Sequence, residues 1–153
     1  MEYSCSLASA QAFAAGGRLE EWVHAYLLSH GNNRAFSEGL RRCPRCFMGP
    51  FRLPRGWFTR CCGPEPGMKY PVEAAGFWRH VEELAAAIQA GEDLPPLIAN
   101  YAGGVFELND GNHRLEALTR LGAAECNVIV WCTGEEDRRA FLAVYARYKA
   151  QQR

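Results

Sequence analysis

The stretch that decides the fold is Leu108-Asn109-Asp110-Gly111-Asn112-His113-Arg114-Leu115-Glu116-Ala117-Leu118. A short strand expected over 105–109 ends at Asp110-Gly111, which is a common turn signal. Leu115 and Leu118 then begin the apolar stripe of a helix. The stretch therefore predicts a strand that turns at Asp-Gly and enters a helix at once.

The start of this helix has the features of an anion-binding site. The first-turn amides of a helix have no intrahelical partner, and they lie at the positive end of the helix dipole. Gly111 has no Cβ to keep an anion from the backbone, and His113 and Arg114 add side-chain donors. The pattern favours a phosphate, most naturally that of a nucleotide.

A plainer interpretation fits the same spacing. Asp110 is then the N-cap of the helix, and His113 and Arg114 are solvated side chains. Asp-Gly turns before helices are common, so the spacing alone does not choose between the two interpretations.

The elements on either side predict an α+β fold with a small mixed β-sheet flanked by helices. Two short strands surround a Gly-Gly turn, a buried strand follows the decisive helix, and a last helix carries a stripe of large apolar residues. The expected elements are a helix from Pro71 to Gly91, strands over 97–101, 105–109 and 126–131, a helix ended by Gly122, and a last helix bearing Phe141, Leu142, Tyr145 and Tyr148.

The beginning of the chain is expected to be a separate helical part. Residues 18–30 place large apolar side chains on one helical face, and Gly31 ends the helix. We therefore predict an N-terminal helical extension over 1–33 and a main domain over 34–153. Within this domain, residues 34–71 hold many Pro and Gly breakers, so we expect mostly loop with a short extended piece at Pro50–Leu53.

The arrangement resembles the ParB/sulfiredoxin superfamily. The resemblance covers about residues 70–132: LPPLIANY from Leu94, a short strand, NDGNHRLEAL from Asn109, and an apolar strand. Its centre is a DGxHR-type turn, Asp110–Arg114. In that superfamily the turn and the helix start hold nucleotide phosphates; members include sulfiredoxins, ADP-dependent free-serine kinases and the CTP-binding domains of chromosome-partitioning proteins.

The chain differs from some of these members at the turn, and these differences indicate which branch of the superfamily it resembles most. Sulfiredoxins place their nucleophilic Cys where this chain has Asn112, so sulfiredoxin activity is not expected. Partitioning proteins carry a Glu-Arg-Arg version of the turn and a helix-turn-helix that has no counterpart here. The DGxHR form is most similar to the free-serine-kinase-like branch.

The resemblance implies a nucleotide, ATP, ADP or CTP, with Mg²⁺ bound through its phosphates. It implies a nucleotide-binding phosphotransferase or NTPase that acts on a small molecule, although it leaves open whether the protein is an enzyme. For Asp110 the alternative is a helix cap, and for Glu116 a solvated helix residue. The implied residues are Asp110 and Glu116 for catalysis, and Gly111, Asn112, His113 and Arg114, together with Arg60, for cofactor binding.

Charge is unevenly spread along the chain. Seventeen Lys and Arg balance 17 Asp and Glu, which argues against a protein that coats DNA. Residues 34–69, however, hold seven Arg and one Lys against two Glu. Within this basic segment the stiff loop 59–70, with Arg60, is expected to form a lid or the acceptor pocket; the alternative is a structural wrap over the sheet edge.

Cysteine spacing suggests a second kind of site. Cys43-Pro-Arg-Cys46 and Cys61-Cys62 predict a small zinc site, although adjacent thiolates fit a tetrahedron poorly; the alternative is reduced thiols. The other three cysteines, Cys5, Cys126 and Cys132, are expected to be core residues.

Two other functions remain open. One is a ParB-like nucleic-acid-binding or regulatory module without catalysis, which would use the basic segment. The other is a zinc-dependent scaffold. The first residues do not read as a signal peptide and no apolar run reaches the length of a membrane span, so we expect a cytoplasmic protein with no membrane partner.

Overall fold

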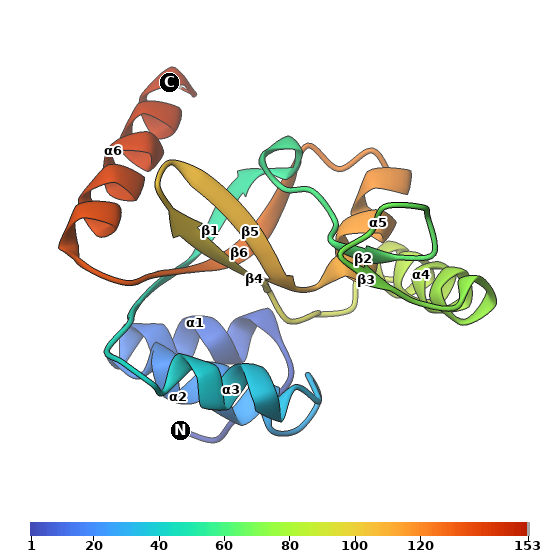
Figure 1. Cartoon of the computed structure of the whole chain (residues 1–153), viewed down its shortest axis with the longest axis horizontal. Helices are drawn as coiled ribbons and strands as arrows, with labels where there is room; N and C mark the ends of the chain where they lie inside the picture. Colours follow the sequence, from blue (N-terminus) through green and yellow to red (C-terminus); the bar gives the residue numbers. More distant parts are fainter. Residues whose placement is uncertain (153) are drawn as a thin grey trace.

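The computed structural model describes residues 1–152 and has the predicted α+β architecture (Figure 1). The helices are α1 Leu7–Ala15, α2 Leu19–Leu27, α3 Arg34–Leu40, α4 Ala74–Gln89, α5 Asn112–Arg120 and α6 Glu135–Gln151, with a 3₁₀ turn η1 at Arg55–Trp57. The strands are β1 Cys46–Pro54, β2 Cys62–Gly63, β3 Tyr70–Pro71, β4 Leu97–Ala102, β5 Val105–Asp110 and β6 Glu125–Cys132.

A four-stranded mixed sheet forms the centre of the molecule. Its order is β1-β6-β4-β5, with β6 parallel to β4 and antiparallel to β1. Strands β4 and β5 form an antiparallel hairpin, as the Gly103-Gly104 turn predicted. The two-residue strands β2 and β3 pair separately, beside the start of α5 (Figure 1).

Strand β1 corrects the expectation of a mostly irregular segment. It is nine residues long and pairs with β6 on both sides of a register shift between Met48 and Phe51. The Gly49-Pro50 dipeptide that looked like a breaker lies in this irregularity, where a proline does not interrupt the ladder. The predicted extended piece at Pro50–Leu53 is only the second half of the strand.

Helix α3 is a second correction within the same segment. The side chain of Asn33 caps it by accepting a hydrogen bond from the amide of Phe36 at 3.1 Å. Leu40 is buried in the same core as α1 and α2. The structure thus groups α3 with the two helices before it (Figure 1).

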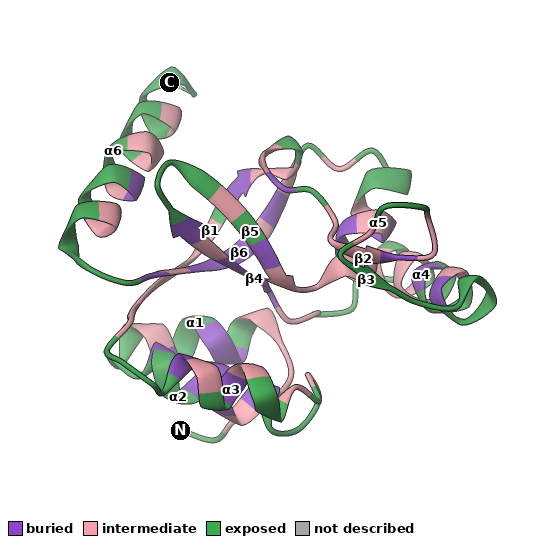
Figure 2. Ribbon diagram, viewed as in Figure 1, coloured by how far each residue is buried: buried purple, intermediate pink, exposed green. Residues whose placement is uncertain are grey.

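Helices cover both faces of the sheet. Val128 and Val130 of β6 belong to the core under α6, whereas Ile129 points into the core under α1–α3. Figure 2 shows this buried layer in purple along β4 and β6. Helices α4 and α5 pack together at one end of the sheet, around Phe77 and Val81. No helix within residues 1–152 is long and apolar enough to cross a bilayer.

Helix α6 depends on one aromatic anchor. Phe141 is its only fully buried residue, and its ring contacts Phe51 of β1 at a centroid distance of 5.1 Å. We expect Phe141→Ala to lower the free energy of unfolding by about 3–5 kcal/mol because it opens a cavity in the core. Urea denaturation measures this change.

The matched control is Arg139→Ala on the same helix. Its side chain is 79% exposed, so the change is expected to stay within about 0.5 kcal/mol. Equal losses in the two variants would contradict the anchoring role of Phe141.

Candidate functional site

A cavity of about 460 Å³ opens at the N-terminal end of α5. Strand β5 ends at Asp110, and the chain passes through Gly111 into the helix. The predicted strand–turn–helix is therefore confirmed. The cavity is lined by Cys5, Tyr26, His30, Gly31, Cys62, His80, Leu84, Leu94, Pro95 and Asn109–Arg114.

Only glycine fits at position 111. Its φ is 101°, in the left-handed region, and an added Cβ would lie 2.3 Å from Cδ2 of Leu97. The same Cβ would lie 3.1 Å from Nη2 of Arg114. The turn therefore brings the backbone of the helix start close to packed side chains without steric conflict.

The first turn of α5 has free amides. Gly111 is the N-cap, and no side chain caps the helix. The first helical hydrogen bond runs from the amide of Leu115 to the carbonyl of Gly111, at 2.8 Å. The amides of Asn112, His113 and Arg114 thus have no acceptor within the helix, and they border the cavity.

Asp110 does not cap α5, contrary to one of our expectations. Its Oδ2 accepts hydrogen bonds from Nη2 of Arg114 at 2.9 Å and from the hydroxyl of Tyr26 at 2.8 Å. Arg114 also donates from Nη1 to the Tyr26 hydroxyl and from Nη2 to the carbonyl of Pro96. Both members of the ion pair are 14% exposed, and burial raises the pKa of Tyr26.

The sequence suggested that the Arg114 side chain is free to donate hydrogen bonds to a phosphate. In the structure it is instead a structural cation. Its guanidinium is committed to Asp110, Tyr26 and Pro96. Its Nε is buried and has no hydrogen-bond partner among the described residues. The side chain still places its positive charge beside the cavity.

His113 is the side-chain donor that remains at the helix start. Its ring lies 4.4 Å from that of His80 on α4 and 4.5 Å from that of Phe77, measured between centroids. Burial, followed by the charges of His80 and Arg114, lowers the pKa of His113 to about 4. His113 is thus neutral near pH 7 and has one N–H to donate.

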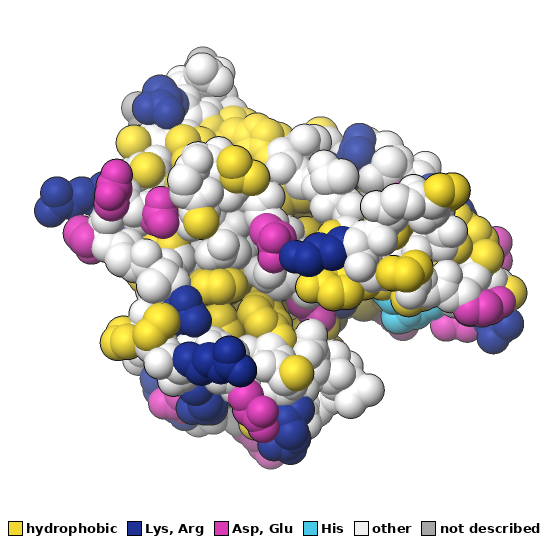
Figure 3. All heavy atoms as spheres, in the orientation of Figure 1, with side chains coloured by type: hydrophobic (Ala, Val, Ile, Leu, Met, Phe, Trp, Pro, Cys, Tyr) yellow, Lys and Arg dark blue, Asp and Glu magenta, His cyan; other side chains and the backbone are white. Residues whose placement is uncertain are grey.

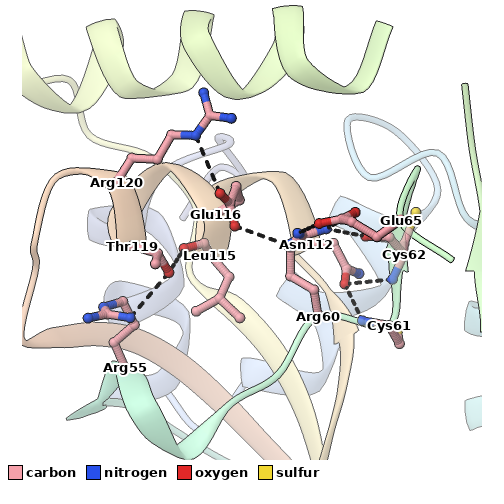
Figure 4. A network of polar contacts seen from close by, with 10 residues as sticks. All are labelled: Arg55, Arg60, Cys61, Cys62, Glu65, Asn112, Leu115, Glu116, Thr119 and Arg120. Carbon is pink, nitrogen blue, oxygen red and sulfur yellow. Dashed lines mark hydrogen bonds and ion pairs between the residues drawn. The ribbon is translucent and has the colours of Figure 1, made fainter. Parts of the chain in front are cut away.

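Asn112 fastens the loop that follows η1 to the start of α5. Its Oδ1 accepts hydrogen bonds from the amides of Cys61 and Cys62, at 2.8 and 3.1 Å (Figure 4). The thiol of Cys61 is turned away and donates to the carbonyl of Leu108. Asn112 therefore positions one wall of the cavity.

Arg60 fastens the same loop to the body of α5. It pairs with Glu65 and with Oε1 of Glu116, the latter at 3.2 Å, as Figure 4 shows. Its guanidinium also lies over the ring of Phe77, 5.0 Å from the centroid. Neither Arg60 nor Glu116 lines the cavity, and Glu116 pairs with Arg120 as well.

A second cavity, of about 540 Å³, adjoins the first. The two share Cys62, Asn109 and Asn112 as lining residues. The remaining lining residues of the second cavity are Asn33, Ala35, Phe36, Cys61, Tyr70, Glu107 and Leu108. The loop 59–70 thus contributes to both cavities.

The four cysteines of the predicted zinc site are not gathered at one place. Cys43 is exposed and Cys46 begins β1, whereas Cys61 and Cys62 lie beside Asn112. Within residues 1–152, no three His, Cys, Asp or Glu side chains are arranged to hold a metal ion.

Sequence reasoning missed the part that the N-terminal helices play in the site. Cys5, Tyr26, His30 and Gly31 form one wall of the first cavity. Cys5, expected in the core, is partly exposed. The available signal was the hydroxyl of Tyr26 within an apolar helical stripe, since a buried tyrosine hydroxyl needs a polar partner.

Removing Arg60 should free the loop. Arg60→Ala leaves Glu65 and Glu116 without their shared cation, so we expect a loss of about 1–3 kcal/mol in the free energy of unfolding. We also expect faster amide hydrogen exchange across residues 59–71.

The control for this variant is Arg120→Ala, which removes the other cation paired with Glu116. Arg120 is 40% exposed, so its loss should cost less than about 1 kcal/mol and leave the exchange of the loop unchanged. Unchanged loop exchange in Arg60→Ala would refute the fastening role.

The environment of His113 predicts a dependence of stability on pH. Its pKa is about 4 in the folded state, against an ordinary value of 6.5. Between these values the unfolded chain binds a proton that the folded chain does not, so stability falls as pH drops from 6.5 toward 4. Above pH 6.5 the group contributes no pH dependence.

We expect His113→Gln to have a shallower loss of stability in this window, because glutamine does not titrate. Urea denaturation at a series of pH values measures both slopes. The groups that face His113 are His80, Arg114, Asp110 and Arg60, and all remain in the variant. Parallel profiles for the two proteins would rule out this source of pH dependence.

Comparison with known proteins shows what part of the chain is similar to a known family. Residues 77–144 match the model of the ParB N-terminal domain. A solved structure, sulfiredoxin from Arabidopsis thaliana, is similar with 22% sequence identity and a TM-score of 0.44, over 63% of this chain and 97% of that one. No curated protein matched the chain. The matched region runs from α4 into α6 and includes the start of α5.

Proposed function

We propose that this protein binds a nucleoside di- or triphosphate in the cavity at the start of α5 and transfers a phosphoryl group to a small acceptor or to water. The observation that carries the proposal is the uncapped N-terminus of α5, whose free amides border a cavity of about 460 Å³. Backbone amides at the positive end of a helix dipole are a favourable environment for phosphate oxygens.

The side chains around these amides suit a polyphosphate. Gly111 leaves the backbone accessible, and neutral His113 offers an N–H without the desolvation cost of a buried charge. Arg114 contributes positive charge from a fixed position, held there by Asp110 and Tyr26. In this proposal Asp110 and Arg114 are positioning residues.

The adjoining cavity is the proposed place for the acceptor. It shares Cys62, Asn109 and Asn112 with the first cavity, so an acceptor there would lie next to the phosphate. Catalysis of phosphoryl transfer rests mainly on positioning and on stabilisation of charge. The loop fastened by Asn112 and Arg60 would supply the positioning, which supports the acceptor-pocket role expected for it.

The Mg²⁺ that the superfamily resemblance implies fits only as an ion carried by the nucleotide. Asp110 is the single carboxylate lining the first cavity among the described residues, and it is committed to Arg114 and Tyr26. Mg²⁺ commonly binds through phosphate oxygens and water. When bound, it would neutralise part of the phosphate charge.

The nucleic-acid-binding alternative gains little support from the basic segment. Arg45, Arg52, Arg55 and Arg60 each donate hydrogen bonds to other parts of the chain. On the face shown in Figure 3, Lys and Arg side chains gather mainly over the α1–α3 unit, which includes the first residues of the basic segment. These four arginines therefore hold parts of the fold together.

The test is Asn112→Asp, which places a negative charge at the start of α5, beside the free amides. The variant keeps an oxygen to accept from Cys61 and Cys62, and a negative charge at a helix start favours folding. We expect stability to be retained and the affinity for ADP, ATP or CTP with Mg²⁺ to fall at least about tenfold, because the carboxylate repels phosphate. Isothermal titration calorimetry measures the binding.

The matched control is Asn127→Asp on β6. Asn127 lines neither cavity of the proposed site, so the same change of charge there should leave nucleotide affinity unchanged. Absence of nucleotide binding in the wild-type protein, or equal binding by Asn112→Asp, would refute the proposal.

A further inference from the structure

Two cysteines lie opposite each other on the neighbouring strands β1 and β6, outside the proposed site. Cys46 is the first residue of β1 and Cys132 the last residue of β6, and they are direct partners in the antiparallel ladder. Directly opposed residues of an antiparallel pair point to the same face of the sheet. The CxxC motif that stood out in the sequence therefore has a third cysteine beside it.

The spacing of such partners suits a disulfide bond. Opposed Cα atoms in an antiparallel ladder lie about 4.5 or 5.5 Å apart, depending on the hydrogen-bonding class of the pair. Disulfides join Cα atoms separated by about 4.4–6.8 Å. Both classes fall inside this range, so the bond would need no rearrangement of the strands.

The two thiols belong to directly opposed residues and differ in exposure. Burial, followed by the neighbouring Cys46 thiol, raises the pKa of Cys132 to about 11. Cys132 is buried, whereas Cys46 is partly exposed. An external reagent would thus react with Cys46 first, because Cys132 is less accessible to solvent.

We propose that Cys46 and Cys132 form an oxidisable dithiol site whose co-reactant is a low-molecular-weight disulfide such as oxidised glutathione. The Cys46 thiolate attacks this disulfide, forming a mixed disulfide and releasing one glutathione thiolate. The Cys132 thiolate then attacks the Cys46 sulfur and releases the second. Two protein thiols are oxidised, one external disulfide is reduced, and the two protein protons end on the two glutathiones.

The bond would secure an edge of the sheet. Strand β1 is an edge strand whose ladder partner is β6. The new bond would close the long stretch of chain between the two strands. Closing a long loop restricts the unfolded chain and so stabilises the folded one. The site is independent of the nucleotide proposal, since neither cysteine lines the two cavities described above.

The experiment treats the reduced, folded protein with oxidised glutathione and maps disulfide-linked peptides by mass spectrometry. We expect a Cys46–Cys132 linkage, the loss of two titratable thiols, and a rise of roughly 5–10 °C in the unfolding midpoint that dithiothreitol reverses. The rate of bond formation should increase with pH, because Cys132 must ionise to attack.

Three variants make the assignment specific. Cys46→Ala, at the more exposed position, and Cys132→Ala, at the buried one, should each lose the linkage and the thermal shift. Cys43→Ser should keep both, because Cys43 is exposed and does not belong to the ladder pair. The reduced forms of all variants, checked by circular dichroism, give the reference for folding.

Three outcomes would overturn the proposal. The first is a Cys43–Cys46 linkage as the main product, and the second is a mixed disulfide that stays at Cys46 without resolving. The third is a zinc ion that occupies these thiols in the purified protein, detected by elemental analysis.

Discussion

The site depends on one largely buried ion pair, Asp110–Arg114, to which the hydroxyl of Tyr26 is hydrogen-bonded. Arg114 lies in the first turn of α5 and Asp110 ends β5, so the pair fixes the angle at which strand becomes helix. Removing one partner of such a pair leaves an uncompensated buried charge and costs about 3–5 kcal/mol. Since Tyr26 comes from α2, the same contact joins the N-terminal helices to the α5 turn.

This arrangement separates the residues that shape the site from the groups that face a ligand. The hydrogen bonds of four site residues are made within the protein itself, namely those of Asp110, Arg114, Asn112 and Arg60. What remains open to a ligand is backbone, namely the uncapped amides of α5, together with a neutral His113. In the proposed function such a site would hold an anion by fixed dipoles, which need no reorganisation when the ligand binds.

Local patterns predicted the elements but not their partners. The strands β4, β5 and β6 and the helix α5 follow from apolar periodicity and turn residues, which are local properties. Strand β1 did not, because its Gly49-Pro50 breaker is tolerated only through pairing with β6. In the site, the position of Gly111 was predictable from the turn, whereas the role of Tyr26 arises from a contact between residues 84 positions apart.

The sequence by itself therefore determined the strand–turn–helix, the α+β class and the resemblance to the ParB/sulfiredoxin superfamily, because these depend on neighbouring residues. Only the tertiary structure decided which charged groups are free. Arg114, Arg60 and Glu116 read as phosphate ligands or catalytic groups in the sequence, yet each is paired in the fold. The physical reason is that a buried charge must find a partner, and that partner often lies far away along the chain.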